Sequence, residues 1–202
     1  MLTVRTSFGS PFGRKARIAV SVLGLDGKVK VESATTTDPS DPLRKQNPLG
    51  KIPVLILDDG SAIYDSPVIL EYLDHLAGGG KILPKDFNAR LAALKLQALA
   101  DGIMDAALLQ VYEGRFRPED RHEPKWVSHQ ADKVRRGLDH AEAHLSETGQ
   151  DLHIGQIALA CALGYLDLRF AGRWRESYPK LVAWLGDFES RVPAFAKTRV
   201  TP

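Results

Sequence analysis

Short apolar runs and helical patterns alternate along the first 77 residues of the chain. Two helices are predicted there, over residues 11–23 and 67–76, because their apolar residues recur at three-to-four spacing. Four strands are predicted, over Leu2–Thr6, Lys28–Ser33, Ile52–Leu57 and Ala62–Tyr64. The β-α-β order of the first three elements makes the first strand pair parallel. The Asp-Gly turn at residues 59–60 makes the last two strands a hairpin.

From residue 89 onward the spacing of apolar residues is helical. The predicted helices are residues 90–112, 122–145, 156–171 and 178–191, the last capped by Ser177. Residues 156–171 are almost entirely apolar, which predicts the buried centre of this half. A run of three glycines and Pro84 marks a linker before it. We therefore expect an α/β plus all-α fold: an α/β domain over residues 1–77, a linker over 78–88 and an all-helical domain over 89–202.

Composition and charge narrow the function classes. The chain has 202 residues, of which 44% are hydrophobic and 26% charged, as in ordinary globular proteins. The 27 basic and 25 acidic residues give a net charge of +2, which argues against a nucleic-acid or membrane surface. The single cysteine, Cys161, cannot form an internal disulfide, which fits a reducing compartment. The chain shows neither a signal peptide pattern nor a membrane-spanning apolar run, so a cytoplasmic protein is expected.

Residues 47–74 combine two features that suit a peptide ligand. Pro53 lies inside an apolar run, and a proline in a strand belongs at a sheet edge or where a backbone group is left free. About a dozen residues later, Asp65-Ser66-Pro67 predicts a helix start with Ser66 as N-cap. The free N–H groups and positive dipole end of that helix suit a carboxylate.

Four segments together resemble the cytosolic glutathione transferase family, in its small bacterial, serine-type branch. They are SPFGRKAR (10–17), GKIPVL (50–55), YDSP (64–67) and IALACALGYL (157–166). The resemblance covers the whole chain and implies a thioredoxin-like domain followed by a helical bundle. It also implies a homodimer, with glutathione as co-substrate and a small electrophile as the second substrate.

By this resemblance, the hydroxyl of Ser10 donates a hydrogen bond to the sulfur of glutathione. A thiol has a pKa near 8.5, so such a bond and a helix N-terminus raise the thiolate fraction at neutral pH. Without the resemblance, Ser10 before Pro11 is simply an N-cap. Ser7 is the nearby alternative, ranked lower because Ser10 is the residue at the helix start.

The resemblance also implies the residues that hold the rest of glutathione. A cis Ile52-Pro53 bond turns the backbone of Ile52 toward the cysteinyl residue, and Lys51 pairs with the glycine carboxylate. Asp65 and Ser66 hold the γ-glutamyl end, although family members more often carry Glu or Gln in place of Asp65. Without the resemblance, Lys51 is a solvated lysine at a strand edge, and Asp65 and Ser66 form an ordinary helix cap.

Further site residues are expected on the helical half. Asp101 resembles an aspartate that some family dimers lend to the neighbouring subunit's glutathione; a solvated helix residue is the alternative. The hydrophobic substrate pocket is expected to include Phe12, Met104, Leu108, Tyr112 and Tyr165, unless these side chains are ordinary core. The family usually begins its core helix with a Ser/Thr-x-x-Asp capping box. Here His153 is a poor cap, and Gln156 is expected to reach back to the N-cap N–H.

We read the chain as a glutathione transferase that activates the thiol for attack on a small electrophile. The alternatives are a non-catalytic glutathione or hydrophobic-ligand binder, a scaffold, or a glutathione-dependent peroxidase or isomerase. No metal is expected, because His140 and His144 have i,i+4 spacing without a third ligand. Cys161 is expected to be buried and inert. Residues 14–17 contain three basic side chains, expected on a partly solvated face, with Arg17 tying the two domains together.

Overall fold

The computed structural model describes residues 1–200, and within them four strands form one sheet in the order β2-β1-β3-β4. The strands are β1 (Leu2–Thr6), β2 (Val29–Ser33), β3 (Val54–Ile56) and β4 (Ala62–Ile63). β1 and β2 are parallel, and β3 and β4 form a hairpin, which confirms both strand pairings. β3 is nevertheless a central strand, antiparallel to β1, and not an edge strand. Pro53 is compatible with this position because it precedes the ladder, which starts at Val54.

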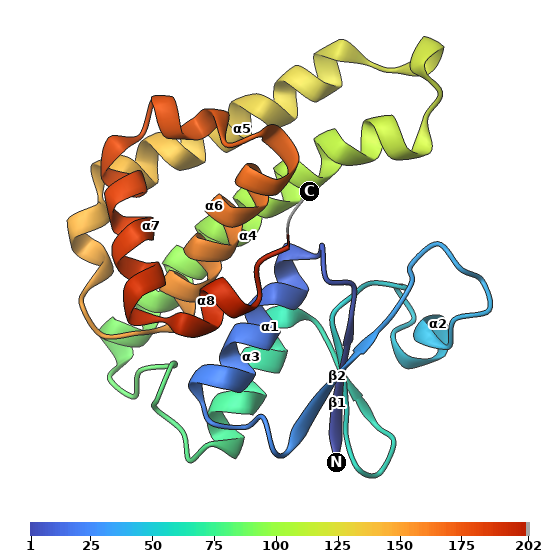
Figure 1. Ribbon diagram of the computed structural model, residues 1–202, viewed down its shortest axis with the longest axis vertical. Coiled ribbons are helices and arrows are strands. Elements are labelled where there is room, and N and C mark those ends of the chain that lie inside the picture. The colour runs from blue at the N-terminus through green and yellow to red at the C-terminus, as the bar shows by residue number, and fades with distance from the viewer. Residues whose placement is uncertain (201–202) are drawn as a thin grey trace.

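Three helices accompany the sheet. They are α1 (Pro11–Val22), α2 (Leu43–Gln46) and α3 (Ser66–Leu76). α1 and α3 lie side by side on one face of the sheet, whereas α2 lies beyond the other face (Figure 1). The apolar residues of α1 and α3 are buried against the sheet because they recur on one side of each helix. α1 therefore separates the sheet from the helical half of the molecule.

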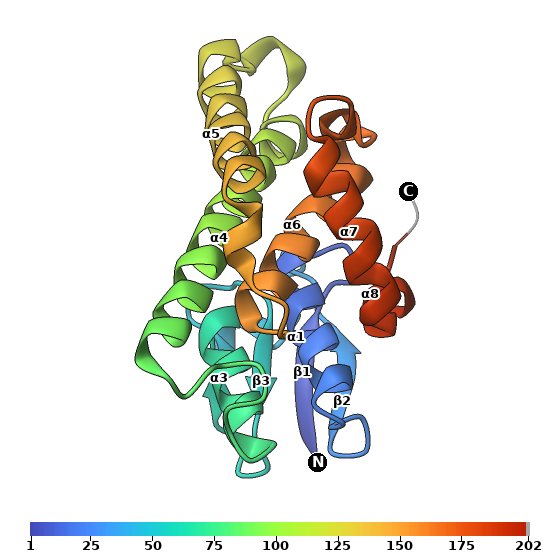
Figure 2. The ribbon, with the colours of Figure 1, turned by 90° about the vertical axis from the view of Figure 1, so that its left-hand side faces the viewer.

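The second half is helical. Its helices are α4 (Phe87–Phe116), α5 (Pro124–Ala143), α6 (Ile154–Phe170), α7 (Pro179–Arg191) and α8 (Pro193–Lys197). Short 3-10 turns cover residues 119–121, 145–148 and 173–176. α6 is buried between α4 and α1, which confirms the prediction that residues 156–171 form the centre of this half (Figure 2). The five-residue α8 was missed, since so short a helix leaves little periodic pattern.

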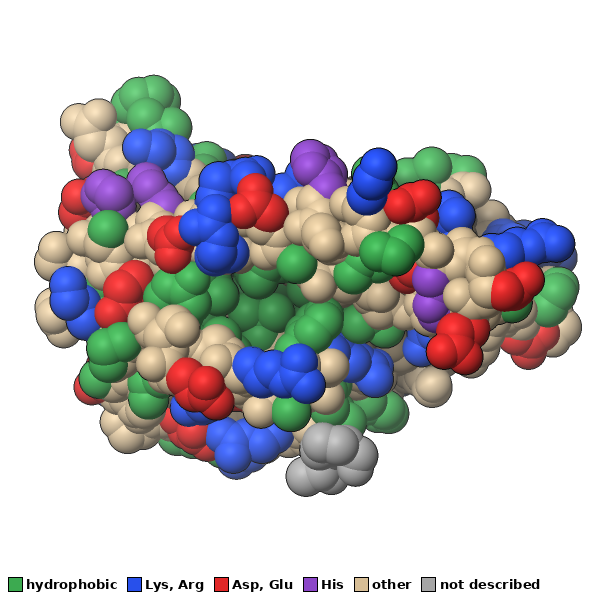
Figure 3. Space-filling view, turned by 90° about the horizontal axis from the view of Figure 1, so that it is seen from above, with side chains coloured by type: hydrophobic (Ala, Val, Ile, Leu, Met, Phe, Trp, Pro, Cys, Tyr) green, Lys and Arg blue, Asp and Glu red, His purple; other side chains and the backbone are tan. Residues whose placement is uncertain are grey.

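Seen from above, the molecule is hollowed near the centre of the face in view (Figure 3). Apolar side chains line this hollow, and charged side chains of both signs surround it. The mixed signs agree with the small net charge of +2. Within residues 1–200, no helix has both the length and the apolar character needed to cross a membrane.

The predicted glycine linker is held in place by one buried carboxylate. Asp74, at the end of α3, accepts hydrogen bonds from the backbone N–H groups of Gly80, Lys81 and Ile82 at 2.7, 2.9 and 2.7 Å. The carbonyl of Ile82 in turn accepts the N–H of Ile154 at 2.8 Å, at the start of α6. The segment between the two halves is therefore a fixed turn that joins α3 to the central helix.

Three predicted helix starts need correction. α3 begins at Ser66, so Asp65 and not Ser66 takes the N-cap position. α7 begins at Pro179, and its N-cap is Tyr178 and not Ser177. His153 was predicted to be a poor cap for α6, yet its Nδ1 accepts the N–H groups of Gly155 and Gln156 at 3.1 and 3.4 Å.

His153 caps α6 because both nitrogens of its ring have hydrogen-bond partners. Nε2 lies 2.8 Å from the carbonyl oxygen of Thr148, which can only accept, so Nε2 carries the proton and Nδ1 is free to cap. Gln156 was predicted to reach back to the N-cap N–H. Its side-chain amide instead donates to the carbonyls of Thr148 and Gly149 at 3.2 and 2.8 Å. Both side chains therefore bind the turn that precedes α6.

The cap makes a prediction about pH. Burial lowers the pKa of His153 below its ordinary value of 6.5, and a proton on Nδ1 would face two N–H donors. The unfolded chain binds a proton near pH 6.5 and the folded chain does not, so this residue makes the free energy of unfolding fall as pH drops below 6.5. His153→Ser keeps a cap without a titrating group. We expect urea unfolding of this variant to depend less on pH in that range.

His153→Ala is the matched control, since it removes the cap and the titration together. We expect it to cost about 1 kcal/mol at neutral pH, where His153→Ser costs little. An unchanged pH slope in His153→Ser would contradict the assignment of the neutral ring as the cap.

Candidate functional site

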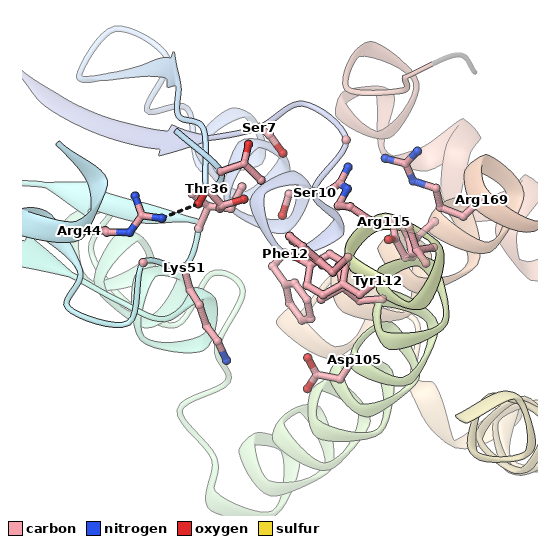
Figure 4. A pocket seen from close by; sticks show the side chains of 18 residues that line it. Ser7, Ser10, Phe12, Thr36, Arg44, Lys51, Asp105, Tyr112, Arg115 and Arg169 are labelled. Carbon is pink, nitrogen blue, oxygen red and sulfur yellow. Dashed lines mark hydrogen bonds between the residues drawn. The ribbon is translucent and has the colours of Figure 1, made fainter. Parts of the chain in front are cut away.

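A cleft of about 530 Å³ opens between the α/β half and the ends of α4 and α6 (Figure 4). The α/β half contributes the loop before α1, the segment before β3 and part of the β2–α2 loop. Its lining residues from this half are Ser7, Gly9, Ser10, Phe12, Thr36, Thr37, Arg44, Gly50, Lys51 and Ile52. The helical half contributes Asp105, Leu108, Val111, Tyr112, Arg115, Phe116, Tyr165 and Arg169. The two walls of the cleft therefore come from the two halves of the molecule.

Ser10 lies at the N-terminus of α1 in this cleft. Its Oγ accepts the N–H of Gly13 at 3.1 Å, which confirms the predicted N-cap, and Pro11 follows as the first helical residue. A hydroxyl that accepts one hydrogen bond still has its own proton to donate. The positive end of the helix dipole adds to the preference for a negative charge beside this hydroxyl. Ser7 also lines the cleft, so the structure brings both candidate serines together.

Gly13 lets α1 start this close to the sheet. A Cβ built on Gly13 would lie 1.8 Å from Oγ1 of Thr6, at the end of β1. No side chain fits there, so the first turn of α1 and the strand before it approach closely only because residue 13 is glycine. Sequence reasoning missed this role, although a glycine inside the first helical turn is a signal of close approach.

The segment before β3 presents its backbone to the cleft. The Ile52-Pro53 peptide bond is cis, as predicted, and both Lys51 and Ile52 line the cleft. Asn47, which is buried, holds this segment: its side-chain amide donates to the carbonyl of Lys51 at 2.9 Å. Sequence reasoning did not single out Asn47, because a buried amide in a loop leaves no periodic pattern.

Other predicted residues on this side lie beyond the lining. Pro53, Asp65 and Ser66 are outside it: Ser66 is buried in the first turn of α3, and Asp65 is exposed just before it. The structure thus brings Ser10, Lys51 and Ile52 together around the cleft, and it places the start of α3 as a separate helix end in the same half.

The predicted Asp101 is engaged within its own chain. Its carboxylate lies 2.5 Å from Nζ of Lys15, whose side chain on α1 is fully buried. Burial raises the pKa of Asp101, and the ammonium of Lys15 opposes that rise. One helical turn later, Asp105 lines the cleft, where burial raises its pKa and Lys51 opposes the rise. Asp105 was missed because nothing in the sequence says which side of α4 faces the α/β half.

The expected substrate pocket is largely assembled. Phe12, Leu108, Tyr112 and Tyr165 line the cleft, whereas Met104 is fully buried outside it. Burial raises the pKa of the Tyr165 phenol. The helical half thus contributes the rings of Tyr112 and Tyr165 to the cleft, and α1 contributes the ring of Phe12.

Arg115 and Arg169 also line the cleft and were missed. The guanidinium carbon of Arg115 lies 5.7 Å from the ring centre of Tyr112, and that of Arg169 lies 5.8 Å from the ring centre of Tyr165. Their spacing from these tyrosines, three and four residues along a helix, is a signal that could have found them.

Arg14 and Lys15 are buried, which corrects the expectation of a partly solvated face, whereas Arg17 is half-buried. Arg14 is buried and donates to the carbonyl of Phe195 at 2.7 Å and to Oγ1 of Thr198 at 3.2 Å. Arg14, with Lys15, therefore joins α1 to the helical half, whereas Arg17 stacks on Phe8 at 4.8 Å. Within residues 1–200, Nη1 of Arg17 is buried without a hydrogen-bond partner, so a connection through Arg17 stays a prediction.

Cys161 is buried, as predicted, on α6. Burial raises the pKa of its thiol to about 11, so it stays protonated at neutral pH. It therefore offers no nucleophile of its own.

The chain belongs to the glutathione S-transferase family. Residues 6–81 match the family's N-terminal domain, and residues 124–187 match its C-terminal domain. This agrees with the fold described above, a thioredoxin-like half followed by a helical half.

Similar proteins cover almost the whole chain. The GST-like protein YibF of Escherichia coli, described as uncharacterized, is 36% identical over 196 residues, which span 95% of both chains. A glutathione transferase family member from Pseudomonas fluorescens Pf-5, solved with bound glutathione, is 41% identical with a TM-score of 0.91 and full coverage of both chains. A second structure of such a family member from the same organism, with bound S-(propanoic acid)-glutathione, is 40% identical with a TM-score of 0.87 and the same coverage.

The Lys15–Asp101 pair makes a prediction about stability. Lys15→Met leaves the buried carboxylate of Asp101 without its counter-ion, which we expect to lower the free energy of unfolding by about 3 kcal/mol at neutral pH. The double variant Lys15→Met/Asp101→Asn should recover most of that loss. Because protonation removes the unpaired charge, the deficit of Lys15→Met should shrink as pH falls through the raised pKa of Asp101.

Urea unfolding measures the loss in Lys15→Met, its recovery in the double variant and its dependence on pH. Lys28→Met, on the exposed α1–β2 turn, is the control for loss of a lysine. Equal free energies of unfolding for Lys15→Met and Lys28→Met would show that the Lys15–Asp101 pair does not stabilise the fold.

Proposed function

We propose that the protein is a glutathione transferase in which Ser10 stabilises the thiolate of glutathione for attack on a small electrophile. The observation that carries this proposal is the position of the Ser10 hydroxyl: it lies at a helix N-terminus, in the cleft, with a proton to donate. The thiol loses its proton to solvent, and the thiolate is the nucleophile. Its sulfur forms a bond to carbon, and a leaving group departs with its electron pair.

The energies are of the right size for this role. A hydrogen bond to a charged group contributes about 1.5–3 kcal/mol, and a helix N-terminus adds about 0.3–1 kcal/mol. One pKa unit corresponds to about 1.36 kcal/mol, so the two together lower the thiol pKa from near 8.5 by about one to three units. Such a shift makes the bound thiol largely ionised near neutral pH.

The glutathione is proposed to lie along the α/β wall of the cleft. The backbone of Ile52, beside the cis Pro53, pairs with the cysteinyl residue, and Lys51 pairs with the glycine carboxylate. Asp65 and Ser66 hold the γ-glutamyl end at the start of α3. A homodimer is part of the proposal, with Asp101 as the residue facing the partner's glutathione.

The aromatic wall is proposed to hold the electrophile. Phe12, Leu108, Tyr112 and Tyr165 line the cleft, and Met104 is buried outside that lining. The relative from Pseudomonas fluorescens with bound S-(propanoic acid)-glutathione supports this reading, because its ligand carries a carbon group on the sulfur. The one cysteine is buried and protonated, which favours a substrate thiol as the nucleophile. We place this activity in detoxification in the cytoplasm.

The test is the ultraviolet difference spectrum of bound glutathione against pH, recorded for the native protein and for Ser10→Ala. We expect a thiolate band that titrates below pH 8.5 in the native protein, and about one unit higher in Ser10→Ala, because the charge-assisted hydrogen bond is lost. The rate with 1-chloro-2,4-dinitrobenzene should fall about tenfold in the variant at neutral pH.

Two further variants separate catalysis from capping. Ser10→Thr keeps both hydroxyl and cap and should restore the titration, whereas Ser7→Ala tests the neighbouring serine in the same cleft. A thiol that titrates alike in the native protein and in Ser10→Ala would make Ser10 a cap only and the protein a glutathione binder. Failure to bind glutathione would overturn the proposed function altogether.

A further inference from the structure

Two guanidinium groups lie beside Ser10 on the helical side of the cleft (Figure 4). Arg115 is in the last turn of α4, and Arg169 is in the last turn of α6. A Cβ built on Gly9 would lie 3.0 Å from Nη2 of Arg169, so this guanidinium rests on the backbone next to Ser10. The guanidinium carbons of Arg115 and Arg169 lie 5.7 and 5.8 Å from the ring centres of Tyr112 and Tyr165, and both rings line the same cleft.

Neither arginine has an acidic partner within residues 1–200. The neighbouring carboxylates on the same helices are already engaged: Glu113 lies 3.4 Å from Arg117, and Asp167 lies 2.6 Å from Arg175. Arg115 and Arg169 form no ion pair in that part of the chain. No carboxylate of residues 1–200 pairs with these two charges, so an anion that enters the cleft can bind them.

The acidic residue of the cleft does not neutralise them. Asp105 lies on the same wall nearly three helical turns before Arg115, and its carboxylate interacts with Lys51 and Lys15. The α/β wall adds Arg44, which already donates to the carbonyls of Asp38 and Thr36 at 3.0 and 3.2 Å. The positive charge beside Ser10 is thus a local feature of the helical wall.

Two like charges in one partly enclosed cleft repel each other, and an anion that binds there reduces that repulsion. The flat fork of a guanidinium matches a carboxylate with two hydrogen bonds, whereas a water molecule supplies no charge. The aromatic rings of Phe12, Tyr112 and Tyr165 border the same region and suit a planar apolar group. A carboxylate attached to such a group satisfies both features at once.

We propose that the second substrate is an electrophile with a carboxylate on a planar apolar body, and that Arg115 and Arg169 bind that carboxylate. The proposal rests on the proposed function, because it takes the glutathione sulfur to lie at Ser10. Arg115 and Arg169 are specificity residues in this scheme: they distinguish anionic from neutral electrophiles and position the reacting carbon toward the sulfur.

The first test is equilibrium binding, which does not depend on turnover. Titration calorimetry compares S-(4-carboxybenzyl)glutathione with S-(4-carbamoylbenzyl)glutathione, two thioethers of nearly equal shape that differ in charge. We expect the native protein to bind the carboxylate at least tenfold more tightly, as expected for a charged hydrogen bond. Arg115→Gln and Arg169→Gln should each remove most of that ratio, and Arg169→Lys should keep part of it.

The control is Arg173→Gln, which removes one exposed arginine just beyond α6 and outside the lining of the cleft. It should leave the ratio at its native value. Equal binding of the two thioethers by the native protein would overturn the proposal, while binding of the amide would still support the glutathione site. If Arg115→Gln and Arg169→Gln weakened both thioethers and glutathione equally, the arginines would bind glutathione itself, and the inference would be wrong.

The second test is turnover of a matched pair, 4-chloro-3,5-dinitrobenzoate and its primary amide. In both, the sulfur of the thiolate bonds to the ring carbon that carries chlorine, the carbon–chlorine bond breaks, and chloride leaves with the electron pair. Intrinsic reactivity cancels when the ratio of kcat/KM values is compared between proteins. We expect this ratio to fall about tenfold in the double variant Arg115→Gln/Arg169→Gln, mainly through KM. An unchanged ratio would contradict the proposal even if both substrates react.

Discussion

Two buried cations on α1 determine how the halves of this molecule meet. Arg14 donates to the C-terminal segment at Phe195 and Thr198, and Lys15 pairs with Asp101 on α4. A buried cation is costly unless its partners are held in place, so these contacts fix α1 against the helical half from two sides. Ser10 begins the same helix. Its position relative to α4 and α6, and hence the cleft itself, follows from residues four and five places further along the chain.

The two walls of the cleft are built from different parts of the chain's chemistry. The α/β wall offers backbone groups, at Ile52 and at the N-terminus of α1, which suit a peptide because every peptide has groups that pair with them. The helical wall offers aromatic rings and two guanidinium groups, which are side chains able to distinguish one class of molecule from another. The α/β wall therefore suits a ligand that is the same throughout the family, and the helical wall suits a ligand that differs between family members. Fold membership therefore says more about glutathione than about the electrophile.

The features that were predicted from sequence are those that depend on neighbours along the chain. The hairpin at residues 59–60, the cap at Ser10 and the buried α6 all follow from local pattern, and the cis Pro53 was expected from the family resemblance. The helix caps at Asp65, Tyr178 and His153 are local misses. The misses in the cleft concern contacts between distant residues. α4 packs against α5, α6 and α1 at once, so its 30 residues are apolar on several sides. Spacing alone could not say that Met104 would be buried and Asp105 would face the cleft.

Ser10 shows how a folding role and a binding role can share one side chain. The cap uses a lone pair of Oγ toward the N–H of Gly13, whereas a thiolate would use the hydroxyl proton, so neither bond displaces the other. The cap also fixes where that proton can point, since a hydroxyl that accepts one hydrogen bond has fewer directions left for its own donation. Gly13 contributes to both roles, because only glycine lets this turn lie against Thr6 and so sets the depth of the hydroxyl in the cleft. If the thiolate binds as proposed, the stability of the first turn of α1 is part of the chemistry, because the ordered helix start limits the directions open to the serine proton.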